Sequence, residues 1–320
     1  MSIFAGFDGG GTKTLCVLCD ENGRFLGSGL GGPSNHIYCG KEAAAQSVRD
    51  AVSNAFADAG MEPCRFKAAY MASAAILLQH GDAHVPFFST CIDAETLICE
   101  SDIFPIWYGS VREEPAVVTI AGTGAVTYVC SREEFIRVSG WGPLLGDEGS
   151  GYSLALSALR LACRMYDGRE ERDEAFISSI FEHYDVTAPG QLLLKLNRGD
   201  TRSLVASCAK TVFELNAAGN GTASKLLGLC ADEIALAVTT VIDKDPSGRS
   251  YPLILSGSLV GRNTALIPLL EERLIKQGSR VSRLCWLESH PAAVSAALAL
   301  HSQGLDDAAE ALLTATGGLL

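Results

Sequence analysis

One pattern of short apolar runs and polar turns occurs twice in the chain, and this repetition limits the folds that are possible. Gly11 and Gly29 lie 18 residues apart, and so do Gly122 and Gly140. When the two copies are aligned with Gly11 on Gly122, three other pairs of positions are also identical: Thr12 and Thr123, Cys19 and Cys130, and Ser28 and Ser139. An internal repeat of this size predicts two homologous domains.

Each copy is expected to form an antiparallel meander of three strands. Asn22-Gly23 gives the first meander a strong hairpin signal. The predicted strands cover residues 3–7, 15–19 and 24–30 in the first copy, and 117–120, 126–130 and 135–138 in the second. Two such domains facing each other would each contribute a turn with Gly and Thr to one cleft.

The rest of the chain predicts an α/β fold in two domains. Further strands are expected at 66–71, 97–99, 252–255 and 283–287. Helical spacing of apolar residues predicts helices at 41–59, 152–165, 171–184, 190–197, 203–217, 223–241, 264–277, 291–301 and 306–314. A polar stretch ending in Pro115 marks the boundary. We therefore expect an N-terminal domain at 1–115, joined by the C-terminal helix at 303–320, and a second domain at 116–302 with a helical insertion.

Composition limits the partners and the compartment. The formal net charge of −12 argues against nucleic acid as a partner, because phosphate backbones require basic surfaces. No apolar run is long enough to span a membrane, and the N-terminus does not resemble a signal peptide. The 11 cysteines have no repeating spacing and indicate reduced thiols in a cytoplasmic protein. Cys16 and Cys19 fall in one predicted strand and should point to opposite faces.

The stretch from Ser139 to Tyr152 contains five glycines and the adjacent carboxylates Asp147 and Glu148. An apolar, helix-forming run follows it directly. A Gly-rich loop before a helix lets the backbone approach a ligand and points free N–H groups at it. Ser150 is better spaced than Asp147 to cap that helix.

Two further turns have the composition of phosphate-binding turns. Gly9-Gly10-Gly11-Thr12 and Gly122-Thr123-Gly124 could each hold phosphate with N–H groups and a hydroxyl. Asp8 could hold Mg²⁺ through water. Taken singly, each turn could be plain hairpin geometry, but the matched pair favours phosphate. The sequence has neither a Walker A loop nor a dinucleotide fingerprint, because Lys13 follows Thr12 and the first turn leads into a strand.

Four segments together resemble one family. They are Asp8-Gly9-Gly10-Gly11-Thr12-Lys13-Thr14, Ser34-Asn35-His36, Ala121-Gly122-Thr123-Gly124 and Gly140-Trp141-Gly142-Pro143-Leu144-Leu145-Gly146-Asp147-Glu148-Gly149-Ser150. They are similar to the N-acetylglucosamine kinase-like branch, which includes the BadF/BadG/BcrA/BcrD-type ATPases, of the sugar kinase, actin and heat-shock chaperone superfamily. The resemblance covers nearly the whole chain. It implies two ribonuclease-H-like domains around an interdomain cleft, with ATP and Mg²⁺ as cofactors.

The resemblance also implies roles for individual residues. Asp8 would bind the metal, and Asp102 would be the catalytic base, with Asp93 and Glu100 as alternatives. Ala125 departs from the family, which usually has Ser there. The implied nucleotide-binding residues are Asp8, Gly10, Gly11, Thr12, Lys13, Gly122, Thr123, Gly124, Gly257 and Ser258. The implied sugar-binding residues are Asn35, His36, Asp102, Gly140, Trp141, Gly142 and Asp147.

Structural roles remain open for several of these positions. Asn35 could be a turn residue that holds its own backbone. Trp141 could be a wall against which a sugar stacks, or a side chain that fills the core. His36 and His290 are expected in loop and capping positions rather than as catalysts.

The resemblance implies an amino-sugar kinase that phosphorylates N-acetylglucosamine at O6 and acts as a cytoplasmic homodimer on small molecules. Glucosamine and N-acetylmuramic acid are alternative substrates. An alternative of another class is an ATPase that activates a partner enzyme. Such activators hold an iron–sulfur cluster on closely placed cysteines, and here no Cys pair falls on a plausible loop at a domain edge.

Overall fold

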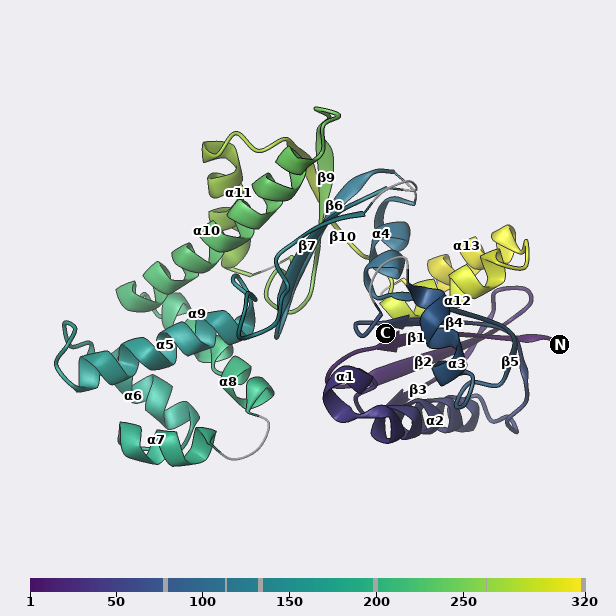
Figure 1. Ribbon diagram of the computed structural model, residues 1–320, viewed down its shortest axis with the longest axis horizontal. Helices are drawn as coiled ribbons and strands as arrows, with labels where there is room; N and C mark the ends of the chain where they lie inside the picture. The colour runs from purple at the N-terminus through teal and green to yellow at the C-terminus, as the bar shows by residue number, and fades with distance from the viewer. Residues whose placement is uncertain (77–79, 113, 132–134, 198–200, 263, 318–320) are drawn as a thin grey trace. The chain divides into compact units, whose positions relative to one another are not determined.

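Two compact units make up the chain in the computed structural model, which describes residues 1–76, 80–112, 114–131, 135–197, 201–262 and 264–317. The first unit is Met1–Glu114 with Leu287–Leu320, and the second is Pro115–Trp286. Each contains one five-stranded sheet with helices packed against it (Figure 1).

The sheet of the first unit has the strand order β3-β2-β1-β4-β5. β1, β2 and β3 form an antiparallel meander, and β4 and β5 extend it in parallel with β1. Its strands are β1 (Ile3–Gly9), β2 (Thr14–Asp20), β3 (Phe25–Gly31), β4 (Phe66–Ser73) and β5 (Ala94–Ser101). Its helices are α1 (His36–Cys39), α2 (Lys41–Asp58), the 3₁₀ helix η1 (Gly81–His84), α3 (Val85–Phe88), α4 (Ile103–Val111), α12 (Pro291–His301) and α13 (Asp306–Thr316).

The second unit repeats this topology. Its strand order is β10-β9-β6-β7-β8, which is the first order read from the other edge. Its strands are β6 (Ala116–Ala121), β7 (Ala125–Cys130), β8 (Phe135–Val138), β9 (Tyr251–Ser256) and β10 (Val281–Trp286). Its helices are α5 (Gly151–Tyr166), α6 (Glu174–His183), α7 (Pro189–Leu196), α8 (Arg202–Ser207), α9 (Ala209–Ala217), α10 (Gly221–Lys244) and α11 (Leu266–Lys276). The predicted α/β class and the pair of ribonuclease-H-like units are confirmed.

Apolar side chains on both faces of the first sheet are buried under helices. One face packs with α2 through Val48, Ala51 and Phe56, and the other packs with α12 and α13. Cys16 belongs to the first of these clusters and Cys19 to the second, as their spacing in one strand predicts.

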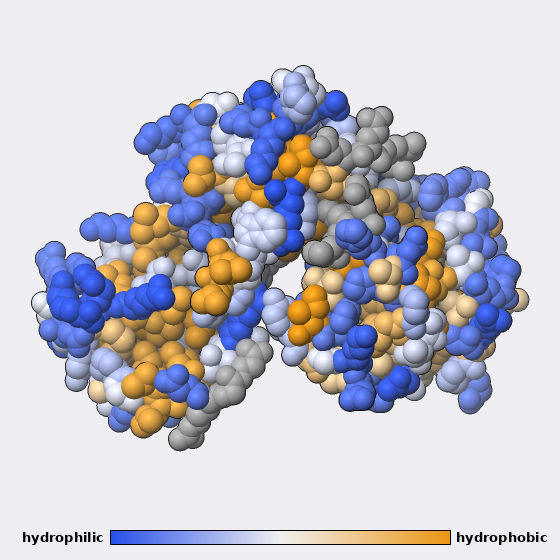
Figure 2. All heavy atoms as spheres, in the orientation of Figure 1, coloured by the Kyte–Doolittle hydropathy of each residue, from blue (hydrophilic) through white to orange (hydrophobic). Residues whose placement is uncertain are grey.

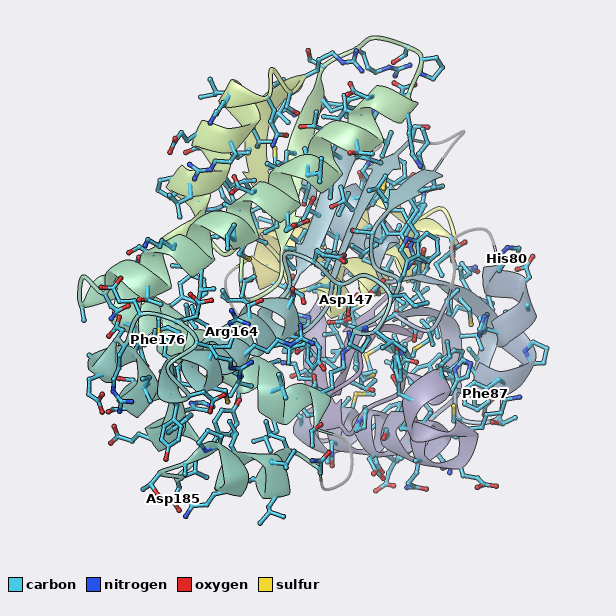
Figure 3. All side chains as sticks on the ribbon, turned by 60° about the vertical axis from the view of Figure 1, so that its left-hand side comes forward. His80, Phe87, Asp147, Arg164, Phe176 and Asp185 are labelled. Carbon is cyan, nitrogen blue, oxygen red and sulfur yellow. The ribbon has the colours of Figure 1, made fainter. Side chains whose placement is uncertain are left out.

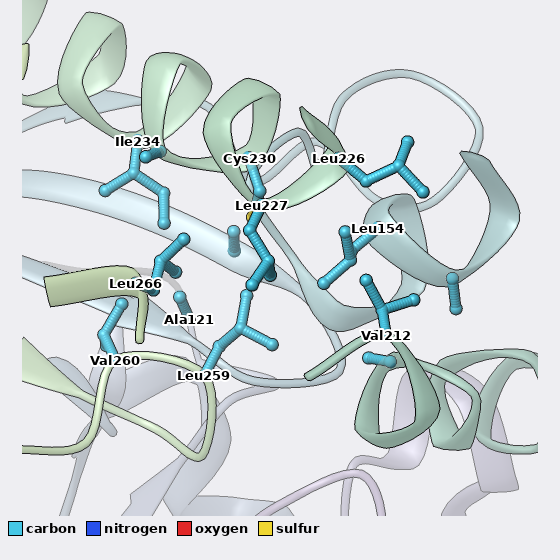
Figure 4. Close-up of a cluster of buried hydrophobic side chains, with 14 of the residues drawn as sticks. Ala121, Leu154, Val212, Leu226, Leu227, Cys230, Ile234, Leu259, Val260 and Leu266 are labelled. Atoms are coloured by element: carbon cyan, nitrogen blue, oxygen red, sulfur yellow. The ribbon is translucent and has the colours of Figure 1, made fainter. Parts of the chain in front are cut away.

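The core of the second unit lies mainly between its sheet and the helices that follow β8. α10 contributes Leu226, Leu227, Cys230 and Ile234 to it, and these side chains pack among residues of α5, α9 and the segment after β9 (Figure 4).

The position of α12 differs from the expectation. The boundary expected at 302/303 would have left this helix in the second domain, whereas it packs across β1, β2 and β4 of the first unit. The contact is close because β1 has Gly6 where the helix crosses. A Cβ atom added there would lie 1.9 Å from the backbone nitrogen of Ala296. Small residues on both elements therefore let two backbones approach each other.

The helix expected at 203–217 is divided into α8 and α9 at Cys208. The Tyr184 hydroxyl donates to the carbonyl oxygens of Leu204 and Val205, each at 3.2 Å. Tyr184, just after α6, thus binds backbone carbonyl groups close to the point where the two helices separate. The spacing of apolar residues along one helix gives no sign of such a tertiary contact.

Apolar side chains also reach the surface in patches among charged residues (Figure 2). One exposed group, Trp141, Leu144 and Leu145, lies in the loop before α5. In the described part of the chain, no helix has the length and apolar character needed to cross a membrane.

The contact between Gly6 and α12 gives a test of this packing. Gly6→Ala should lower the free energy of unfolding by about 1–3 kcal/mol, because a methyl group there overlaps backbone that cannot rotate away. Gly190→Ala is the matched control, since a Cβ atom added in α7 at that residue meets nothing within 4 Å. Urea denaturation measures both. Equal stability of the two variants would contradict the close packing.

Candidate functional site

Two carboxylates of the first unit lie where parallel strands end at the same edge of its sheet, Asp8 as the second-last residue of β1 and Asp102 just after β5. β1, β4 and β5 run in parallel, with Asp8 opposite Ala72 and Ala72 opposite Glu100. Asp102 comes directly after β5, at the start of α4, and its side chain does not cap that helix. The Ser101 hydroxyl donates to Asp102 Oδ1 at 3.3 Å. The register therefore brings Asp8 and Asp102 to one edge, where ligands bind in open α/β sheets.

The negative charge of Asp102 affects the protonation of Asp8. Burial, and next the negative charge of Asp102, raise the pKa of Asp8 to about 6, against a smaller opposing effect of Lys13. Burial also raises the pKa of Asp102, and the hydrogen bond from Ser101 opposes this shift. Burial disfavours the charged form of both carboxyl groups, and the like charge of Asp102 adds to this effect at Asp8.

The alternatives to Asp102 lie in different surroundings. Asp93 precedes β5 and so lies at the opposite end of that strand from Asp102. Its side chain is 79% exposed and pairs with Arg65 at 3.2 Å. Glu100 is half-buried, and burial together with Asp82 raises its pKa. Of the three carboxylates, Asp102 is the one whose charge raises the pKa of Asp8.

His290 is a neighbour of this pair that sequence reasoning missed. Its Nδ1 accepts from the Ala292 N–H at 3.2 Å, so it caps α12, as expected. Its Nε2 also lies 4.0 Å from Asp8 Oδ2. Burial, and next the charge of Lys13, lower the pKa of His290 to about 4, so the ring is neutral at pH 7. In the sequence, His290 precedes Pro291 at the start of a predicted helix. That pattern indicates a capping role but does not indicate the contact with Asp8.

The β1–β2 turn is joined to the loop that carries Asn35. The Gly10 N–H donates to the Lys13 carbonyl at 3.0 Å, and the Gly10 carbonyl accepts from the backbone N–H groups of Ser34 and Asn35. Thr12 and Lys13 are exposed. A Cβ atom added at Gly11 would meet nothing within 4 Å, so that side of the turn is open.

Asn35 and its neighbours form a buried polar group. Asn35 is 5% exposed, and its Oδ1 accepts from the Ile37 N–H at 3.2 Å. It therefore does hold local backbone, and its side-chain NH₂ group is not used in that contact. Ser34 Oγ and His36 Nδ1 are buried and have no hydrogen-bond partner among the described residues. The His36 ring packs against His84 and Phe87, the latter labelled in Figure 3.

In the second unit, the start of α5 supports the Gly122-Thr123-Gly124 turn. The Gly151 N–H donates to the Gly122 carbonyl at 2.7 Å, and the Tyr152 N–H donates to the Thr123 carbonyl at 3.3 Å. Ser150 Oγ accepts from the Ser153 N–H, which confirms Ser150 as the cap. The expectation that free N–H groups of this helix point at a ligand was wrong, because these N–H groups hold the turn.

Asp147 is the buried carboxylate of the second unit (Figure 3). Its Oδ1 accepts from the Gly142 N–H at 3.2 Å, and its Oδ2 lies 2.6 Å from Arg202 Nη2. A Cβ atom added at Gly124 would lie 3.0 Å from Asp147 Oδ2, so this carboxylate lies against the turn. Burial raises the pKa of Asp147, and Arg202 opposes that shift. Sequence reasoning missed Arg202, which begins a helix and belongs to no motif.

Trp141 does not fill the core, since 60% of it is exposed. The Arg137 guanidinium lies over its ring at 4.3 Å, and Arg137 also donates to the carbonyls of Ser139 and Gly140. This arrangement fixes the ring at the surface beside the Asp147 loop, which favours the interpretation of Trp141 as a wall for a ligand.

Gly257 and Ser258 lie against the same turn of the second unit. Gly257 has a φ of +100°, and an added Cβ atom would lie 2.4 Å from the Ala121 carbonyl oxygen. Ser258 Oγ lies 3.8 Å from the Cβ position of Gly122. Gly257 is therefore required both by its backbone conformation and by close approach. Ala125, where the family usually has Ser, is buried at the start of β7.

Known proteins match this chain along most of its length. A family model described as the BadF/BadG/BcrA/BcrD ATPase family matches residues 5–298. The chain is 25% identical over 289 residues to the N-acetyl-D-glucosamine kinase of Dictyostelium discoideum, with 86% of this chain and 90% of that relative covered. It is 24% identical over 246 residues to the N-acetylmuramic acid/N-acetylglucosamine kinase of Clostridium acetobutylicum, with 76% and 80% covered.

A solved structure also shares the fold. A protein of Chromobacterium violaceum, provisionally named an N-acetylglucosamine kinase, has a TM-score of 0.74 at 22% identity, with 94% of this chain and 99% of that chain covered. The resemblance inferred from four motifs is thus confirmed by a match that spans both units. The chain belongs to the BadF/BadG/BcrA/BcrD ATPase family.

Proposed function

We propose that this enzyme is an ATP-dependent amino-sugar kinase that phosphorylates N-acetylglucosamine at O6. The observation that carries the proposal is the arrangement at one edge of the first sheet. There the Gly10 carbonyl joins the Gly- and Thr-containing turn to the Asn35 loop, and Asp102 lies close enough to Asp8 to raise its pKa. The first unit thus combines a turn of the composition found in phosphate-binding turns, a loop that resembles a sugar-binding loop, and the half-buried carboxylate of Asp102.

The two turns that contain Gly and Thr have the N–H groups and hydroxyls that can bind the phosphates of ATP. Gly11 leaves the first turn open, and Gly257 and Ser258 border the second. We propose that Thr12 and Thr123 contact the phosphates, with Gly10, Lys13, Gly122 and Gly124 supplying N–H groups and charge. When bound, Mg·ATP supplies the phosphoryl group, and the ion neutralises charge on the phosphates.

Asp8 fits a Mg²⁺ ion held through water. Mg²⁺ takes few carboxylates and keeps most of its water ligands. The described residues contain no group of three or more His, Cys, Asp or Glu side chains that could hold a metal ion. A single carboxylate suits an ion that arrives with the nucleotide. The neutral His290 beside Asp8 adds no positive charge that would compete with it.

Asp102 is proposed to accept the proton of the sugar 6-hydroxyl. Burial raises its pKa and so makes the carboxylate a better proton acceptor, while Ser101 holds its orientation. In the second unit, Asp147 is proposed to accept hydrogen bonds from sugar hydroxyls, because Arg202 and the Gly142 N–H hold its carboxylate in place and oppose the effect of burial on its pKa. Gly140 and Gly142 flank Trp141, and this segment would line the sugar, while Asn35 and His36 would contact it from their loop.

The names of the two relatives described above support N-acetylglucosamine as a substrate. One relative is named for this sugar, and the other is named for it and for N-acetylmuramic acid. Glucosamine and N-acetylmuramic acid remain alternative substrates. We further propose a cytoplasmic location, which the free thiols of all 11 cysteines support.

A panel of amino sugars tests the proposal, with release of ADP as the signal. N-acetylglucosamine should be turned over fastest, and NMR of the product should show the phosphate on O6. Asp102→Asn should lower kcat by roughly 10²–10⁴-fold with both substrates still bound, because an amide cannot take the proton. The controls Glu100→Gln and Asp93→Asn should keep most of their activity. No sugar-dependent ADP release, or an Asp102→Asn variant as active as the parent, would contradict the proposal.

Substitutions at Asp147 test sugar recognition separately from ATP binding. Asp147→Ala should raise the sugar KM on the order of 10²-fold, because it removes hydrogen bonds to an ionised group. Without the Arg202 cation the pKa of Asp147 rises further. Arg202→Met should therefore raise the sugar KM more at low pH, where Asp147 is protonated, than at high pH, where it is ionised. Glu148→Gln is the control, since Glu148 is the exposed neighbour. If sugars that lack the 3- or 4-hydroxyl react as well as the parent sugar, the assignment of Asp147 is wrong.

A further inference from the structure

α8 carries a residue that holds Asp147, yet little within this helix fixes where it lies. Arg202 is its first residue, and Arg202 Nη2 lies 2.6 Å from Asp147 Oδ2. α8 has six residues, Thr201 before it makes no side-chain cap, and Val205 is its one buried residue. Helices this short are not stable on their own. The position of Arg202 therefore depends on the contacts of α8 with other elements of the second unit (Figure 1).

The local sequence favours one helix across Cys208, where the structure divides α8 from α9. In a continuous α-helix the Cys208 N–H would donate to the Leu204 carbonyl. It donates instead to the Val205 carbonyl at 3.1 Å. The Leu204 carbonyl accepts from the hydroxyls of Tyr184 at 3.2 Å and Ser207 at 2.7 Å. Two side-chain hydroxyls thus take the place of a backbone N–H at the division.

Tyr184 is the buried one of these two residues. It is 1% exposed and follows α6 directly. Its hydroxyl also donates to the Val205 carbonyl at 3.2 Å, and Lys195 Nζ donates to the carbonyl of Tyr184 at 2.5 Å. A buried hydroxyl that loses its acceptor cannot turn to water instead, and this is costly. The contact therefore favours the divided arrangement over the continuous helix.

His183 joins the two sides of the division. Its Nε2 lies 2.8 Å from Ser207 Oγ, and its Nδ1 lies 3.0 Å from Thr211 Oγ1 in α9. The Ser207 hydroxyl gives its one proton to the Leu204 carbonyl, so Nε2–H donates to Ser207 and Nδ1 accepts from Thr211. Burial lowers the pKa of His183, in keeping with this neutral ring. Adjacent residues at the end of α6 thus hold the end of α8 and the first turn of α9.

We propose that Tyr184 is a positioning residue for the sugar site, because it sets the direction of α8 and so places Arg202 beside Asp147. Arg202 lies six residues before Cys208, about 9 Å along a helix, so a change of about 20° in the direction of α8 would move it by about 3 Å. A shift of this size would break its contact with Asp147. This role rests on the proposed function in one respect, the assignment of Asp147 to the sugar, whereas the contact itself can be measured without any sugar.

Titration of Asp147 tests the role in the absence of substrates. Burial raises the pKa of Asp147 and Arg202 opposes that shift, so loss of the contact must raise the midpoint. Arg202→Met should raise it by roughly 1–3 pH units, the usual effect of one adjacent cation. Tyr184→Phe, which removes only the hydroxyl, should raise it by about half as much or more. Carboxyl carbon NMR of the protein labelled in its aspartates measures the midpoint, with Asp147→Asn used to assign the signal.

Two comparisons separate positioning from a general loss of stability. The double variant Tyr184→Phe/Arg202→Met should have the same midpoint as Arg202→Met, because Tyr184 acts through Arg202. Tyr251→Phe is the matched control and should leave the midpoint of Asp147 unchanged. Tyr251 is 2% exposed in the same unit, and its hydroxyl donates to Asp245, outside the proposed sites.

Ser207→Ala is a second variant that removes the other hydroxyl from the Leu204 carbonyl. Ser207 is exposed, so the core stays intact, and the variant takes the place of Tyr184→Phe in the same comparisons if Tyr184→Phe does not fold. An unchanged midpoint in Tyr184→Phe, additive shifts in the double variant, or an equal shift in Tyr251→Phe would overturn the proposal.

Kinetics connect the contact to the sugar. Tyr184→Phe should raise the KM for the sugar severalfold and leave the KM for ATP unchanged, and a raised midpoint with an unchanged sugar KM would overturn the role at the sugar site. If the parent turns over no amino sugar, the proposed function fails, while the titration still decides whether Tyr184 places Arg202. If the parent turns over the sugar and the midpoint of Asp147 does not respond to Tyr184→Phe, the positioning role fails alone.

Discussion

The parallel pairing of β1 with β4 and of β4 with β5 fixes where two acidic side chains of the first unit lie. Asp8 is the second-last residue of β1 and Asp102 directly follows β5, so both carboxylates are held at one edge of the sheet. Burial and the charge of Asp102 raise the pKa of Asp8 above its unfolded value, to about 6. Protonated Asp8 therefore stabilises the folded chain at low pH, and this contribution is lost as the pH rises through about 6. At neutral pH the folded chain therefore holds Asp8 as a charged carboxylate in surroundings that disfavour the charge, and such perturbed groups are typical of functional sites.

The two units share one topology, but different contacts hold the turn between the first two strands of each. In the first, the turn after β1 is held by its own backbone and joins the Asn35 loop through Gly10. In the second, the equivalent turn is held by the first N–H groups of α5. The Asp147 carboxylate lies against that turn and is itself held by Gly142 and Arg202. A duplicated meander thus supplies two rigid turns, and the segments that follow each meander supply the polar groups around them.

Features with a local signal were predictable from sequence. The Asn22-Gly23 turn has the positive φ that Gly provides, and α12 begins at Pro291 and ends at His301 as expected. Features that depend on distant contacts were not. Arg202 reaches Asp147 across 55 residues, His290 reaches Asp8 only because α12 packs on β1, and the α5 N–H groups bind a turn that precedes them. No local pattern reports such contacts. The roles of the site residues remain predictions, and the structure adds the contacts that each of these residues makes.

Asp8 and Asp102 form an interacting pair at the edge of the first sheet, and titration of Asp8 measures that interaction directly. Carboxyl carbon NMR of the protein labelled in its aspartates, with Asp8→Asn used to assign the signal, would follow Asp8 in the absence of nucleotide. We predict a midpoint near pH 6 in the parent and a lower one in Asp102→Asn, where the neighbouring charge is removed. A midpoint near the usual carboxyl value of about 4 in the parent, or an unchanged midpoint in Asp102→Asn, would contradict the account.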